Sequence, residues 1–112
     1  MKWYWDFAAA MAALAFLAGA CAAQAGDAEE SGKALFRQNC VLCHGESGTG
    51  KTPAGTALGA HDLSAREVRK KPDAELELTI NQGKNKMPSF GKKLNETQLH
   101  ELVKYVRSLE KN

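Results

Sequence analysis

The stretch Cys40-Val41-Leu42-Cys43-His44 decides how the rest of the chain is interpreted. It follows the pattern C-x-x-C-H, in which two thiols can add to the two vinyl groups of one porphyrin and the histidine can reach its iron. We therefore expect one covalently bound haem c, with Cys40 and Cys43 as the thioether residues and His44 as an axial iron ligand. The chemistry would then belong to the iron, and the protein would hold and tune it.

Three other interpretations compete for this pair of cysteines. A thiol–disulfide motif would follow a strand in a βαβ unit, and no strand pattern precedes Cys40. A structural zinc ion requires four ligands, and the sequence offers no second cysteine or histidine pair. A disulfide that closes so short a loop gains little from chain entropy. The attachment of haem is the interpretation that the sequence favours.

The beginning of the chain has the layout of a secretory signal. Lys2 precedes an apolar run over residues 7–23, and Ala23-Gln24-Ala25 forms an A-x-A cleavage site. We expect a signal peptide over 1–25, a haem domain over 26–112 and a periplasmic location, which agrees with haem attachment outside the cytoplasm. The alternatives are a retained membrane anchor and cleavage before Cys21 with lipidation of that cysteine.

Removal of the signal peptide changes the inventory of side chains. Met87 becomes the only methionine, and Phe36, Phe90 and Tyr105 the only aromatic residues. So small a domain is marginal at building a core and needs a staple. A buried porphyrin would supply it. The net charge of +2 argues against a nucleic-acid binder.

The apolar periodicity predicts helices and no strands. We expect helices over 27–39, 64–71 and 73–82 and a last helix after Asn95, separated by irregular stretches over 45–59 and 84–94. Ser64 with Glu67 and Asn95 with Gln98 have the spacing of capping boxes, and Gly83 suits a C-terminal cap. The last helix carries an apolar stripe of Leu99, Leu102, Val103, Val106 and Leu109. His100, Lys104, Arg107 and Lys111 are expected on its solvent side.

Met87 is the candidate for the second axial position. It lies in a loop just after a helix, and Pro88 stiffens the backbone that presents its sulfur. Without the cysteine motif, a lone methionine would be read as a core gap-filler. Lys84, Lys86, His61 or an open site remain rivals.

Two clusters of basic residues stand out. Lys84, Lys86, Lys92 and Lys93 flank Met87 and either form a solvated loop or a positive collar that steers an acidic redox partner. A second run of Arg66, Arg69, Lys70 and Lys71 is expected to be a solvated face.

Four elements in order resemble the bacterial class I cytochromes c, over about residues 30–110. These are Gly32 with Phe36, the Cys40–His44 motif, the methionine segment Ile80, Gly83, Met87, Pro88 and Phe90, and the helix end at 102–106. The resemblance implies a small all-α fold with three to four helices around one haem, and His44 and Met87 as axial ligands. It also implies that the aromatic side chain of Tyr105 crosses Gly32 and Phe36, and that the carbonyl of Pro53 accepts a hydrogen bond from His44.

Three functions are consistent with these features. The first is a monomeric carrier of single electrons, because His/Met ligation fills both axial positions and raises the potential. The second is a haem-based sensor or gas binder with a labile sixth position. The third is an electron-delivering subunit docked to a larger oxidoreductase. No set of general acid, base and nucleophile is present, so we expect no catalytic residues of its own.

Overall fold

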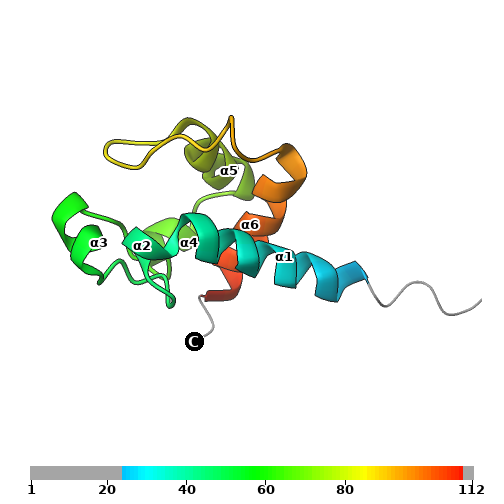
Figure 1. Ribbon diagram of the computed structural model, residues 1–112, viewed down its shortest axis with the longest axis horizontal. Helices are drawn as coiled ribbons and strands as arrows, with labels where there is room; N and C mark the ends of the chain where they lie inside the picture. The colour runs from blue at the N-terminus through cyan, green and yellow to red at the C-terminus, as the bar shows by residue number, and fades with distance from the viewer. Residues whose placement is uncertain (1–23, 110–112) are drawn as a thin grey trace, which may run out of the picture.

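A computed structural model describes residues 24–109 of the chain (Figure 1). The apolar run of the predicted signal peptide, Cys21 and Lys111 lie outside the described residues. Within them the structure is helical, with no strand beyond an isolated bridge between Lys84 and Met87. The helices are α1 (Gln24–Asn39), α2 (Val41–His44), α3 (Pro53–Leu58), α4 (Arg66–Arg69), α5 (Asp73–Gln82) and α6 (Glu96–Ser108).

The fold is held by the crossing of α1 and α6, which Figure 1 shows as the first and last helices lying against each other. A Cβ atom at Gly32 would lie 2.4 Å from the carbonyl oxygen of Glu101 and 3.0 Å from Cβ of Tyr105, so only glycine permits this approach. One turn later the rings of Phe36 and Tyr105 pack with centroids 5.3 Å apart. The predicted contact of Tyr105 with Gly32 and Phe36 is confirmed.

The core lies beneath this crossing. The apolar stripe predicted for the last helix is buried throughout, and Phe36 is fully buried against it. Asn95 and Gln98 form the predicted capping box, since each side chain bonds the other residue's backbone N–H. The predicted span of α5 and its cap at Gly83, where φ is 74°, are also confirmed.

The predicted irregular stretch over 45–59 contains a helix, so that part of the prediction was wrong. Thr52 caps α3 by accepting from the N–H of Gly55, Pro53 occupies its first turn, and Gly59 ends it at φ 70°. These signals are standard ones. The many glycines of residues 45–59 nevertheless argued against a helix, because glycine usually weakens one. The short helix α2 was also unforeseen, so residues 24–109 contain six helices where three to four were expected.

The capping box predicted for residues 64–71 does not form. Ser64 instead donates from its N–H and its hydroxyl to the carboxylate of Asp62, and Ala65 is the N-cap of α4. A local turn around Asp62 therefore competes successfully for the side chain of Ser64. The helix is correspondingly shorter than expected.

Arg107 was expected on the solvent side of α6, but its side chain is three-quarters covered. Its Nε donates to the Asp73 carboxylate at 2.9 Å, and its terminal nitrogens donate to the carbonyls of Val68, Arg69 and Lys71. The guanidinium thus satisfies carbonyl groups where α4 ends and α5 begins. It fastens that connection to α6.

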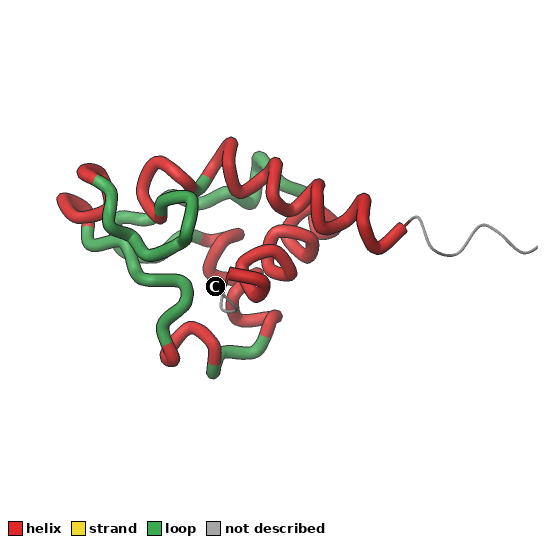
Figure 2. The backbone as a smooth tube through the Cα atoms, turned by 90° about the horizontal axis from the view of Figure 1, so that it is seen from below, coloured by secondary structure: helices red, strands yellow, loops and turns green. Residues whose placement is uncertain are grey.

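Figure 2 shows the helices α1 and α6 on one side of the molecule and most of the loops gathered at the end away from the start of α1. Most of the loops therefore lie away from the crossing of α1 and α6. None of the helices within 24–109 is long and apolar enough to cross a membrane.

Candidate functional site

The cysteine motif lies where α1 gives way to the short helix α2. The N–H of Cys40 still donates to the carbonyl of Phe36, and the N–H of His44 donates to the carbonyl of Cys40 at 2.9 Å. Residues at positions i, i+3 and i+4 of a helical turn share one face. Cys40, Cys43 and His44 are therefore presented together by continuous helical backbone.

An apolar cavity opens beside this face, between α1, α5 and α6. About 480 Å³ of space between atoms lies there, including open solvent at the mouth of the cavity. Its walls are Phe36, Cys40, His44, Leu63, Val68, Leu76, Thr79, Ile80, Met87, Leu102, Val103 and Val106. Most of this wall is aliphatic. The thiol of Cys40, the imidazole of His44 and the thioether of Met87 are the groups in it that can bind a metal or react with a carbon atom.

This set of groups fits a haem. A large flat apolar body suits the aliphatic walls. The thiol of Cys40 suits thioether formation, and imidazole and thioether are axial ligands that iron porphyrins accept. Among residues 24–109, no group of three or more His, Cys, Asp or Glu is placed to hold a metal ion, so the zinc alternative finds no ligand set there.

His44 is oriented by a hydrogen bond to the backbone of another loop. Its Nδ1 lies 3.0 Å from the carbonyl oxygen of His61. A carbonyl can only accept, so Nδ1 carries the proton and Nε2 keeps its lone pair. Burial lowers the pKa of His44, and the bond to the His61 carbonyl opposes that shift. Burial thus favours the neutral imidazole, in which Nε2 keeps its lone pair.

Pro53 was expected to supply this carbonyl, and the structure corrects that prediction. Pro53 lies in the first turn of α3, where backbone carbonyls point along the helix toward later N–H groups. His61 follows α3 and passes beside α2 with its carbonyl free to turn toward His44. Spacing in a glycine-rich loop gave no means of choosing between the two.

Met87 is presented by a short, hydrogen-bonded turn. Lys84 and Met87 exchange both backbone N–H···O bonds, at 3.1 and 2.9 Å, across Asn85, which has φ 53°. Beyond Met87, the N–H of Phe90 donates to the carbonyl of Ile80 and that of Gly91 to the carbonyl of Asn81. The segment expected to be irregular is thus fastened to the end of α5 on both sides of Met87.

The rivals of Met87 lie outside the cavity wall. Lys84, Lys86 and His61 are exposed, whereas Met87 is half-buried and lines the cavity. Cys40 also lines the cavity and is partly buried. Burial raises the pKa of its thiol to about 11, helped by Cys43 and opposed by the positive charge of Lys93. Lys93 is therefore close enough to the cysteine motif for its charge to act there.

The other members of both basic clusters also reach solvent. Lys84, Lys86, Lys92 and Lys93 are all exposed, as expected for either a collar or a solvated loop. In the second run, Arg66, Arg69 and Lys70 are exposed and Lys71 pairs with Glu75. Leu42, between the two cysteines, is 78% exposed, which is unusual for a leucine in a helix.

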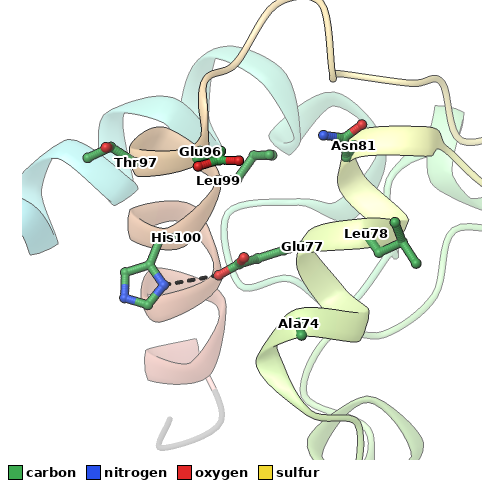
Figure 3. Close-up of a pocket in the computed structure, with 8 residues that line it drawn as sticks. All are labelled: Ala74, Glu77, Leu78, Asn81, Glu96, Thr97, Leu99 and His100. Carbon is green, nitrogen blue, oxygen red and sulfur yellow. Dashed lines mark hydrogen bonds and ion pairs between the residues drawn. The ribbon is translucent and has the colours of Figure 1, made fainter.

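A second, open groove lies between α5 and α6 and was not foreseen (Figure 3). The ring of His100 at its edge bonds the carboxylate of Glu77 at 3.0 Å, while Leu78 and Asn81 line its other wall. His100 was expected on the polar face of its helix and it is exposed there. Because the two partners are 23 positions apart in the sequence, no local pattern predicts this contact.

Comparisons with known proteins agree with this geometry. The family model described as cytochrome C oxidase, cbb3-type, subunit III matches residues 27–106. The chain is 34% identical over 84 residues to the Cbb3-type cytochrome c oxidase subunit CcoP of Azospirillum brasilense, covering 73% of this chain but only 28% of that protein. The chain thus spans less than a third of that relative.

Shorter relatives match over most of their length. Cytochrome c6 of Bumilleriopsis filiformis is 29% identical over 83 residues, which cover 70% of this chain and 88% of the relative. Among solved structures, the KustC0563 c-type cytochrome aligns with a TM-score of 0.65 and 33% identity. That alignment covers 70% of this chain and 96% of the solved one.

Proposed function

The chain belongs to the family of cytochrome c oxidase, cbb3-type, subunit III, and from that premise we propose that it carries single electrons between redox partners with His44 and Met87 as the axial ligands. It is a small class I-like c-type cytochrome of electron transfer with one covalently attached haem c. One observation carries the proposal: the same apolar cavity is lined by Cys40, by His44 and by Met87 from the far segment.

In this proposal each residue has a distinct task. Cys40 and Cys43 form the thioether bonds, and His44 binds iron through Nε2 because its Nδ1 is committed to the His61 carbonyl. Met87 offers a thioether sulfur from the turn that fastens it to α5. When bound, the haem supplies an iron that cycles between the ferric and ferrous states by one electron. A sulfur ligand favours the ferrous state relative to a second nitrogen ligand.

The surface around the motif suits brief contact with an acidic partner. Lys93 acts on Cys40 electrostatically, and Lys84, Lys86 and Lys92 are exposed on the same connection between α5 and α6. The exposed side chain of Leu42 offers apolar contact next to the cysteines. A positive rim raises the rate of encounter and an apolar centre excludes water. We propose that the chain acts as a monomer that docks through this surface.

A docked role is the second candidate, and the match to CcoP favours it. In that relative a segment like this chain forms only 28% of a cytochrome c oxidase subunit. The same lysine surface would then meet a fixed partner. Co-purification with an oxidase at high salt would favour the docked role, whereas release at low salt would favour the shuttle.

We also propose that the chain is exported. The apolar run over 7–23 and the A-x-A site support a signal peptide over 1–25 and a periplasmic domain over 26–112. Mass spectrometry of the protein from cells tests this directly. A mass that corresponds to residues 26–112 with one haem supports the proposal. A mass that shows a lipidated Cys21, or that still includes residues 1–25, contradicts it.

The ligand assignment is tested on the ferric protein. A methionine-to-iron charge-transfer band should be present in the wild type and absent from Met87→Ala. Persistence of the band in Met87→Ala would refute the assignment. Absence of the band in the wild type, together with rapid binding of a small gas by the ferrous protein, would favour a sensor.

A further inference from the structure

The hydroxyl of Thr52 lies at the junction between the cysteine helix and the loop that orients His44. It accepts from the N–H of Gly55 at 2.8 Å and caps α3. The same oxygen lies 2.8 Å from the carbonyl oxygen of Leu42 and 3.0 Å from that of Cys43, to which it can donate. One hydroxyl thus uses both its donor and its acceptor capacity to join α2 to α3.

These bonds belong to a closed circuit that starts and ends at the haem-binding motif. From Cys43 the circuit passes through the Thr52 hydroxyl to the N–H of Gly55. The carbonyl of Gly55 accepts from the N–H of Ala60 at 2.8 Å. The next residue, His61, offers the carbonyl that lies 3.0 Å from Nδ1 of His44.

The close approach of α2 and α3 makes this circuit possible. A Cβ atom at Gly55 would lie 2.1 Å from the carbonyl oxygen of Cys43 and 2.4 Å from that of Gly50. The N–H of Gly50 donates to the carbonyl of His44 at 2.8 Å and braces the same region. The backbone of Gly55 is therefore confined between Thr52 and Cys43, and a shift of Thr52 must be transmitted to the loop ending at His61.

We propose that Thr52 is a positioning residue that fixes the His44 imidazole by holding the His61 carbonyl in place through α3. The inference rests on the proposed role of His44 as an iron ligand. Its chemical consequence is that Thr52 keeps the Nδ1–H bond short and ordered, which makes the imidazole a stronger electron donor to the iron. Thr52 is not among the residues that line the cavity.

The test uses two nearly isosteric changes in the full-length holoprotein. Thr52→Val keeps the shape but removes the hydroxyl, and Thr52→Ser keeps the hydroxyl. Thr56→Val makes the same chemical change on the exposed part of α3 and serves as the matched control. The first readout is the solvent exchange rate of the His44 Nδ1 proton, measured by NMR in the diamagnetic ferrous protein. The second is the midpoint potential.

We expect exchange at least about fivefold faster in Thr52→Val, since the loss of even one hydrogen bond of ordinary strength shifts a local opening equilibrium by that order. We expect the potential to rise, because a less basic imidazole stabilises the ferric state less. Thr52→Ser and Thr56→Val should both match the wild type. If Thr52→Val acted only through a general loss of stability, the wild-type exchange rate would not be restored in Thr52→Ser and kept in Thr56→Val.

Two outcomes separate this inference from the proposed function. Unchanged exchange and potential in Thr52→Val, in a protein whose spectrum retains histidine ligation, would overturn the role of Thr52 and leave the electron carrier intact. A wild-type spectrum without histidine ligation would overturn the function itself. If Thr52→Val fails to take up haem, the Thr52→Ser holoprotein remains the test, and a fivefold faster exchange in it would contradict the inference.

Discussion

Gly32 lies so close to Glu101 that a methyl group at Gly32 would stand 2.4 Å from the carbonyl oxygen of the latter. We therefore expect Gly32→Ala to push α1 away from α6 and to lower the free energy of unfolding of the holoprotein by about 2 kcal/mol. Gly26→Ala is the matched control in the same helix, because open space surrounds that position. Urea denaturation of both variants measures the difference. Equal stability of the two would contradict the tight crossing.

Arg107 should contribute more to the free energy of unfolding than an exposed residue of the same helix. Arg107→Ala removes the bonds to Asp73 and to three backbone carbonyls, so we expect a loss of about 2 kcal/mol. Arg107→Lys should recover only part of it, because one ammonium group cannot reproduce the planar fork. Lys104→Ala, on the exposed side of the same helix, is the control. Thermal unfolding of the holoproteins distinguishes these cases.

A comparison of Gly83→Ala with Gly59→Ala distinguishes backbone strain from crowding at the turn that presents Met87. Both have positive φ, 74° and 70°, but a Cβ at Gly83 would lie 2.7 Å from the carbonyl oxygen of Met87 whereas Gly59 is open. Gly59→Ala should cost about 1 kcal/mol and leave the ferric spectrum unchanged. Gly83→Ala should cost more and weaken the methionine-to-iron band. An intact band in Gly83→Ala would show that the turn tolerates displacement.

Asp62 should contribute to stability only above the acid range. The two bonds from Ser64 lower the pKa of this carboxyl from its ordinary value of 3.8. A lowered folded pKa stabilises the protein above the unfolded value and loses that effect as the pH falls through the folded one. Asp62→Asn should therefore be less stable than wild type at neutral pH but equal to it in acid. When Ser64 is also replaced by alanine, the stability difference between Asp62 and Asp62→Asn should depend less on pH. Chemical denaturation at neutral and acid pH measures this difference.

The haem-free chain should be largely unfolded. Phe36, Leu102 and Val106 belong to the hydrophobic core and also line the cavity, so an empty cavity would expose the core itself. Circular dichroism of the Cys40→Ala/Cys43→Ala chain, made without haem, should show no cooperative melt. A sharp transition like that of the holoprotein would mean that the polypeptide core suffices.

The sequence predicted the features that depend on neighbours along the chain. The capping box of Asn95, the cap at Gly83 and the buried stripe of α6 each follow from residues within a few positions of one another. The Cys40–His44 motif is equally local, and it carried the prediction of haem. Met87 could be nominated because the predicted removal of residues 1–25 would leave no other methionine.

What the sequence could not supply were choices between distant or equivalent partners. His61 rather than Pro53 bonds His44, because α3 turns the Pro53 carbonyl into its own axis. Ser64 turned to Asp62 instead of capping α4, and Arg107 found acceptors more than 30 residues away. Each of these is decided by tertiary packing, which overrides local preference when several partners are chemically equal.

The position of α6 has a consequence for the making of the protein. Five of the eight buried apolar side chains of the described chain, Leu99, Leu102, Val103, Val106 and Leu109, come from this last helix and its cap. Most of the core therefore cannot form before residues 99–109 have been synthesised. A stop codon before Leu99 should leave a chain that lacks five of these eight side chains and cannot build the core.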